Sequence, residues 1–166
     1  MLINEEKNMT KILFVCWGNI CRSPMAEFIF KDIVRRNHAE DRFLVESAAT
    51  HDDNVWNGHG APVYSNAAKE LKKHGISCAG KEAQMLKYSD YDKYDYLIGM
   101  EASNIWEMKD MLPEDTEGKL HRLLDFTDRP KDIDDPWYTR NFGLCYDEIK
   151  EGCEALYRHI EETHPR

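Results

Sequence analysis

Apolar positions along the chain follow two periodicities in alternation, and this alternation predicts strands separated by helices. Short continuous apolar runs predict buried strands, whereas apolar residues three and four positions apart predict helices with one buried face. Strands that alternate with helices indicate an α/β fold, a single domain with a parallel sheet flanked by helices on both faces. The predicted strands are residues 11–16, 43–48, 96–100 and 119–124, and the predicted helices are 23–37, 63–74, a short turn at 89–93, 102–111 and 141–162.

Two longer segments carry turn residues and are predicted to be loops. Residues 50–62 are polar and rich in glycine, and residues 125–140 contain Pro130 and Pro136. Right-handed crossovers bring the C-terminal ends of parallel strands to one edge of a sheet, where ligands bind. The first predicted strand ends at Cys16, which therefore lies at that edge.

Composition and charge limit the classes of protein that fit. The 166 residues, 42% of them hydrophobic and 32% charged, suit one globular domain, which we expect over residues 10–162. The net charge of −9 argues against nucleic-acid or anionic-membrane partners, and no apolar run is long enough to cross a membrane. Residues 1–9 lack the basic start and apolar core of a signal peptide and are expected to be a flexible extension.

The chain has an odd number of cysteines and no export signal, which favours reduced thiols and a cytoplasmic location. The spacing of Cys16 and Cys21 does not suit a close pair of zinc ligands, and no Cys/His pair follows at finger-like spacing. We therefore expect no metal and no cofactor. The cysteines are Cys16, Cys21, Cys78, Cys145 and Cys153.

The segment VCWGNICRSPMAEF, residues 15–28, combines a cysteine at a strand end, a short loop and a helix start. Loop amides and the positive end of the helix dipole form an anion site and favour the thiolate, which is the nucleophilic form of cysteine. Arg22 adds a planar guanidinium that can hold two phosphate oxygens. The structural alternative is that Cys16 has no catalytic role and packs as a small buried apolar residue. Together these parts fit a cysteine that attacks a phosphate ester. The segment lacks the Gly-Lys-Ser/Thr of nucleotide-binding loops, which disfavours nucleoside triphosphate hydrolysis.

Each loop residue has an expected part in this site. Gly18 allows a tight turn, and Asn19 tolerates a left-handed backbone conformation. Ser23 either stabilises the thiolate or caps the helix, and both roles can coexist. Cys21 is either a redox partner of Cys16 or a packing residue, and both interpretations stay open. The predicted phosphate-binding residues are Trp17, Gly18, Asn19, Ile20, Cys21, Arg22 and Ser23.

A proton donor for the leaving group must come from another segment, because the loop has no carboxylate. Asp134 and Asp135 precede Pro136, and an Asp before Pro is most often a turn residue. Aromatic residues near these segments are expected to form the pocket walls, because they can stack on a phenyl ring. The predicted wall residues are Trp17, Trp137 and Tyr138, and Trp56 is a further candidate for the rim.

Five segments in this order resemble the low-molecular-weight protein tyrosine phosphatase family. The resemblance covers roughly residues 10–159 and implies a phosphotyrosine protein phosphatase I-like fold with strand order 2-1-3-4. It implies that Cys16 becomes a phosphocysteine, that Asp135 acts as general acid and then base, and that Ser47 supports the loop with Asn19. The segments are VCWGNICRSPMAEF, ESAAT at 46–50, LKKHGI at 71–76, YDYLIGMEASN at 94–104 and DDPWYTRNF at 134–142.

The resemblance also implies partners and leaves alternatives within the same fold. A phosphotyrosine-containing protein is the implied substrate, and phosphate, vanadate or sulfate are the implied active-site anions. A thioredoxin-coupled arsenate reductase needs a relay of cysteines, for which the segment after the loop offers only Cys78. A protein arginine phosphatase tends to have Thr where this chain has Ile20. The sequence departs from the family at Gly80, where a supporting His is common, and at Trp17, where a smaller residue is usual.

Overall fold

The computed structural model describes residues 9–164, and its sheet contains the four predicted strands. Strands β1 (Thr10–Cys16), β2 (Phe43–Ala49), β5 (Tyr96–Gly99) and β6 (Leu120–Arg122) are all parallel. Their spatial order is β2-β1-β5-β6, which confirms the order 2-1-3-4 implied by the resemblance. Residues 1–8 of the predicted N-terminal extension lie outside the described residues.

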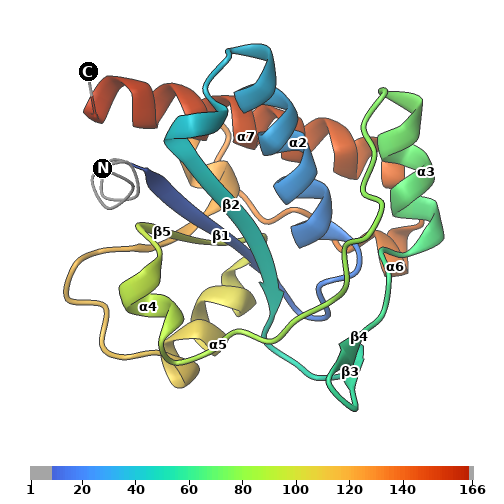
Figure 1. Cartoon of the computed structure of the whole chain (residues 1–166), viewed down its shortest axis with the longest axis horizontal. Coiled ribbons are helices and arrows are strands. Elements are labelled where there is room, and N and C mark those ends of the chain that lie inside the picture. Colours follow the sequence, from blue (N-terminus) through green and yellow to red (C-terminus); the bar gives the residue numbers. More distant parts are fainter. Residues whose placement is uncertain (1–8, 165–166) are drawn as a thin grey trace.

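Helices cover both faces of this sheet, as the alternation of elements predicted. Figure 1 shows α2, α3 and α7 on one face and α4 and α5 on the other. Side chains of a strand alternate between the two faces, so Ile12 and Phe14 pack against the first layer while Leu13 and Val15 pack against the second. The helices are α2 (Arg22–Arg36), α3 (Ser65–Lys73), α4 (Asp90–Lys93), α5 (Ala102–Met111), α6 (Pro136–Thr139) and α7 (Phe142–Thr163), with 3-10 turns at Glu40–Arg42 and Leu123–Phe126.

The first predicted loop, residues 50–62, contains a small hairpin that the periodicity did not indicate. Strands β3 (Val55–Trp56) and β4 (His59–Gly60) pair in antiparallel fashion around a two-residue turn. The turn residues Asn57 and Gly58 both have positive φ, at 51° and 76°, which is the requirement of a type I′ turn. Strands of two residues are too short to show an apolar alternation, so only the Asn-Gly pair signalled the hairpin.

The second predicted loop, residues 125–140, also differs from the prediction. It contains α6, which begins at Pro136 directly after Asp135, and a proline suits the first position of a helix. The fourth strand ends at Arg122 rather than residue 124, because the chain turns into the 3-10 segment Leu123–Phe126. Within residues 9–164, no helix has the length and apolar character needed to cross a membrane.

Candidate active site

The loop between β1 and α2 lies at the C-terminal edge of the sheet and holds Cys16 at its start. Asn19 has a φ of 56°, which is the left-handed conformation expected for it. Gly18 does not have a positive φ; a Cβ there would lie 2.5 Å from Nδ2 of Asn54. A side chain at this position would push the Asn54 amide away, so glycine here accommodates a neighbouring side chain rather than a left-handed turn.

A directed chain of hydrogen bonds ends at the sulfur of Cys16. Asn19 Nδ2 donates to Ser23 Oγ at 2.8 Å and to Ser47 Oγ at 2.9 Å. Ser23 Oγ lies 3.0 Å from Cys16 Sγ. Because Ser23 already accepts a hydrogen bond from Asn19, its hydroxyl proton is free to point at the sulfur and stabilise the thiolate. The helix-cap role for Ser23 is wrong, since α2 begins at Arg22 and its N-cap residue is Cys21.

The other end of this chain is a buried ion pair that the sequence did not reveal. Ser47 Oγ donates to Glu27 Oε1 at 2.6 Å. Lys81 lies 3.1 Å from the same oxygen and donates to the Ser47 carbonyl at 3.0 Å. Gly80, where the family often carries a supporting His, has no side chain, and Lys81 beside it supplies a cation to the network. The one available signal was that Glu27 lies one helical turn beyond Ser23 on the same face.

Lys81→Met is expected to lower the free energy of unfolding by about 1–3 kcal/mol, because Glu27 and the Ser47 carbonyl each lose a buried donor. The side chain of Lys81 is only 10% exposed, whereas that of Lys31, which also pairs with Glu27, is 46% exposed. Lys31→Met is therefore the matched control, with an expected loss below about 1 kcal/mol. Urea denaturation followed by circular dichroism measures both. Equal losses in the two variants would contradict the structural role of Lys81.

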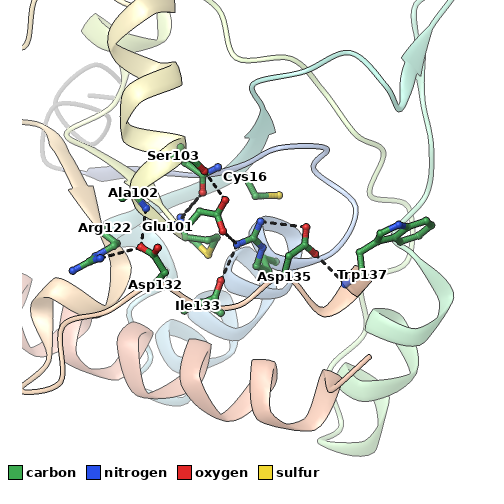
Figure 2. A network of polar contacts seen from close by, with 12 residues as sticks. Cys16, Glu101, Ala102, Ser103, Arg122, Asp132, Ile133, Asp135 and Trp137 are labelled. Atoms are coloured by element: carbon green, nitrogen blue, oxygen red, sulfur yellow. Dashed lines mark hydrogen bonds and ion pairs between the residues drawn. The ribbon is translucent and has the colours of Figure 1, made fainter. Parts of the chain in front are cut away.

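The guanidinium of Arg22 is buried and held by groups from two other segments. Its Nη1 donates to Glu101 Oε2 and to the Ile133 carbonyl, both at 2.8 Å. Its Nη2 lies 3.5 Å from Asp135 Oδ2. Glu101, Ile133 and Asp135 thus converge on one cation (Figure 2). Burial acts to lower the pKa of Arg22, but the negative charges of Cys16, Glu101 and Asp135 outweigh it and raise the pKa. Sequence reasoning missed Glu101, although it lies two residues after β5, at the ligand-binding edge of the sheet.

Asp135 lies at the start of α6, on a segment tied to α5 and β6. Asp135 Oδ1 accepts a hydrogen bond from the Trp137 amide at 3.0 Å. Just upstream, Asp132 Oδ1 accepts from the Ala102 amide at 2.8 Å and from Arg122 Nη1 at 2.9 Å. Figure 2 shows these contacts on either side of Ile133. Asp135, and not its exposed neighbour Asp134, lines the pocket described next.

A pocket of about 380 Å³ opens over Cys16 and gathers most of the predicted site residues. Asn19 and Ser23 are buried and are not among its lining residues. Trp56 does not line it either; its side chain is 56% exposed on β3. Asp53 and Asn54, which no sequence signal singled out, also line the pocket. The lining residues are Cys16, Trp17, Gly18, Ile20, Cys21, Arg22, Asp53, Asn54, Asp135, Trp137 and Tyr138.

Burial makes three of the other cysteine thiols less nucleophilic than Cys16 is expected to be. Burial, with the negative charges of Cys16 and Asp135, raises the pKa of Cys21 to about 12. Burial likewise raises the pKa of Cys145 and of Cys153 above the ordinary thiol value. These three cysteines therefore remain protonated and weakly nucleophilic at neutral pH.

Iodoacetamide at neutral pH is expected to alkylate Cys16 before Cys21, although both belong to the same loop. Only the thiolate reacts, and a pKa of about 12 leaves Cys21 almost wholly protonated until the pH approaches that value. Peptide mass spectrometry at increasing reaction times measures the order. Inorganic phosphate should protect Cys16. Earlier labelling of Cys21, or labelling of Cys16 that phosphate does not slow, would contradict the expected anion site over Cys16.

Comparison with known proteins shows which family shares this sequence and fold. Residues 11–166 match the family described as low molecular weight phosphotyrosine protein phosphatase. The chain is 36% identical over 156 residues to the low molecular weight protein-tyrosine-phosphatase YfkJ of Bacillus subtilis, covering 93% of this chain and 97% of that protein. The crystal structure of YfkJ superposes with a TM-score of 0.86 over 94% of this chain and 97% of that one.

Two further solved structures are similar and carry information about ligands and substrates. Wzb of Vibrio vulnificus, solved in complex with benzylphosphonate, is 26% identical with a TM-score of 0.78, covering 91% of this chain and 99% of that one. A Drosophila arginine phosphatase is 31% identical with a TM-score of 0.82, covering 92% of this chain and 98% of that one. The family match over nearly the whole chain and the shared fold lead to one conclusion: the chain belongs to the low molecular weight phosphotyrosine protein phosphatase family and is a hydrolase of the protein-tyrosine-phosphatase class.

Proposed function

We propose that the protein hydrolyses phosphotyrosine monoesters in two steps, through a phosphocysteine on Cys16 and with Asp135 as general acid and base. The observation that carries the proposal is the arrangement around the pocket. Cys16, with Ser23 placed to donate to its sulfur, lines the same cavity as Arg22 and Asp135. A nucleophile, a cation and a carboxyl group around one pocket are the parts that phosphate-ester cleavage requires.

In the first step the thiolate of Cys16 attacks phosphorus. The S–P bond forms as the bond between phosphorus and the tyrosyl oxygen breaks, and Asp135 gives its proton to that leaving oxygen. In the second step water attacks the phosphocysteine, and the Asp135 carboxylate takes a proton from it. The S–P bond then breaks, which releases phosphate and restores the thiolate.

Charge on the phosphoryl group is balanced by this chain's own donors. Arg22 and the backbone amides of the loop from Trp17 onward hold the non-bridging oxygens, so free phosphate, vanadate and sulfate are expected to bind in the same place. Glu101 and the Ile133 carbonyl occupy Nη1 of Arg22, which holds the guanidinium plane in position. The proposed mechanism needs no metal and no cofactor.

The choice of phosphotyrosine over phosphoarginine rests on the pocket lining. The fold does not separate the two activities, since a Drosophila arginine phosphatase is among the similar structures. Ile20 lines the pocket and presents no hydroxyl group to a substrate, while three aromatic residues line the same cavity. These apolar surfaces suit a phenyl ring better than a guanidinium group.

Arsenate reduction through a cysteine relay has less support. Cys78 is half-buried on the segment that follows α3, and Cys145 and Cys153 are buried within α7. Neither Cys78 nor Cys153 is among the pocket-lining residues.

We also propose that residues 10–162 form the phosphatase domain, that the protein acts in the cytoplasm, and that nucleic acids and membranes are not its partners.

The test of the proposed function is hydrolysis of matched phosphotyrosine and phosphoarginine peptides in the presence of a chelator. We expect the phosphotyrosine peptide to be hydrolysed with the higher kcat/KM, together with turnover of p-nitrophenyl phosphate. Preferential hydrolysis of the phosphoarginine peptide would contradict the proposed substrate. Loss of all activity on removal of metal ions would contradict the proposed chemistry.

A further inference from the structure

The segment that follows β2, residues 50–54, lies along the first three positions of the loop that holds Cys16. The Thr50 amide donates to the Cys16 carbonyl at 3.1 Å, and the His51 amide donates to the Trp17 carbonyl at 3.0 Å. Asn54 Nδ2 donates to the Gly18 carbonyl at 3.1 Å. Each of these three loop positions is therefore fixed by a hydrogen bond from the same neighbouring segment.

The same segment also holds the side chain of Trp17. The indole Nε1 donates to Asp53 Oδ2 at 2.8 Å. The ring of His51 stacks on the indole, with ring centroids 3.3 Å apart and an angle of 8° between the planes. Trp17 is 47% exposed and lines the pocket, so its position is not set by burial in a core. A hydrogen bond at its edge and a stacked ring on one face fix it instead.

His51 is in turn held by contacts to α5, which lies on the face of the sheet opposite α2. Thr50 Oγ1 donates to Glu107 Oε2 at 2.6 Å, and His51 Nδ1 lies 2.9 Å from Thr50 Oγ1 and 3.0 Å from Glu107 Oε2. Because the one hydroxyl proton of Thr50 goes to Glu107, Nδ1 must carry a hydrogen to bond either oxygen. This fixes the orientation of the imidazole ring and connects Trp17 to a helix.

We propose that Asp53 and His51 are specificity-determining positioning residues that hold Trp17 as a fixed wall, so that the pocket selects flat aryl phosphates over alkyl phosphates. This inference rests on the proposed function, whose substrate class it explains. A wall that is already ordered loses little side-chain freedom when a ring packs on it, whereas a mobile indole would have to be ordered on binding. The loss of that ordering is expected to weaken aryl recognition roughly 3- to 10-fold.

The binding of two phosphonates distinguishes the contribution of the Trp17 wall to affinity from the contribution of the anion site. Benzylphosphonate carries the ring and methylphosphonate does not, and neither is hydrolysed. Calorimetry gives the ratio of the two dissociation constants for each variant. We expect this ratio, methyl over benzyl, to fall roughly 3- to 10-fold in Asp53→Ala and in His51→Ala, with little change in the Kd for methylphosphonate.

Conservative variants and a neighbouring charge provide the controls. Asp53→Asn keeps an oxygen that accepts from the indole and should restore most of the ratio. His51→Phe keeps a stacking ring but loses the Nδ1 contacts to Thr50 and Glu107, so it should restore only part of the ratio. Asp52→Ala removes an exposed charge beside Asp53 and should leave the ratio unchanged. In turnover of p-nitrophenyl phosphate, Asp53→Ala should raise KM while kcat stays close to that of the parent protein.

An unchanged ratio in Asp53→Ala and His51→Ala would overturn the inference. So would equal loss of affinity for both phosphonates, because that would mean damage to the anion site. Failure of Asp53→Asn to restore the ratio would mean that charge, not the hydrogen bond to Trp17, is responsible, and would also overturn it. These outcomes are distinct from failure of the proposed function, which would appear as absence of aryl phosphatase turnover in the parent protein while the binding ratio still behaved as expected.

Discussion

Cys16→Ser is expected to reduce kcat for p-nitrophenyl phosphate by roughly 10⁴-fold or more, because a serine hydroxyl needs a general base to become a nucleophile. The Sγ of Cys16 lies 3.0 Å from the hydroxyl of Ser23, which is not a base. The anion site itself, Arg22 and the loop amides, is untouched by the substitution. Vanadate or phosphate should therefore bind with nearly the parent affinity, as measured by calorimetry.

Cys78→Ser is the matched control, since Cys78 is half-buried and lies outside the pocket. It should retain close to the parent kcat. Two results would contradict the account: substantial turnover by Cys16→Ser, or loss of vanadate binding in that variant, which would mean that the substitution had disrupted the loop.

Asp135→Ala is expected to slow hydrolysis of substrates with poor leaving groups by about 10²–10⁴-fold, which is the usual contribution of general acid catalysis. Substrates whose leaving phenolate is already stable need no proton and should be affected far less. The measurement is kcat/KM across a series of substituted phenyl phosphates, plotted against the pKa of the leaving phenol. The slope should become steeper in Asp135→Ala.

Asp134→Ala is the neighbouring control, because Asp134 is exposed and Asp135 lines the pocket. Its slope should match that of the parent protein. A steeper slope in Asp134→Ala with an unchanged slope in Asp135→Ala would move the general acid by one position. No change of slope in either variant would place the proton donor on another segment.

The parts of the fold that could be predicted are those in which apolar periodicity extends over several residues. The apolar run that ends at Cys16 packs against helices on both faces of the sheet. Its residues are therefore continuously apolar, and the central strand β1 was predicted correctly. The hairpin around Asn57 and the helix at Pro136 were missed because both are too short to show a period and lie in segments whose glycine or proline content predicted loops. The local signals in these segments were single turn residues: an Asn-Gly pair suits the hairpin turn, and a proline after Asp135 suits the start of a helix.

For the candidate site too, the residues that could be predicted are those whose signal lies within one short segment of the sequence. Cys16 and Arg22 were found because their chemistry is concentrated in one contiguous segment, and Asp135 came from the family resemblance. Glu101 and the Glu27–Lys81 pair were missed, because those contacts join segments far apart in the sequence. The helix-cap role considered for Ser23 was wrong for a related reason: the helix begins one residue earlier, and a hydrogen bond from Asn19 turns the hydroxyl toward the sulfur.

The covalent intermediate is the central claim, and it can be trapped. Asp135→Ala should slow the attack of water on the phosphocysteine, because the carboxylate that accepts the proton is missing. Acid quench of this variant during turnover of p-nitrophenyl phosphate, followed by peptide mass spectrometry, is expected to find a phosphoryl group on Cys16. Continued turnover with no phosphorylated Cys16, or with the phosphoryl group on another residue, would contradict the mechanism.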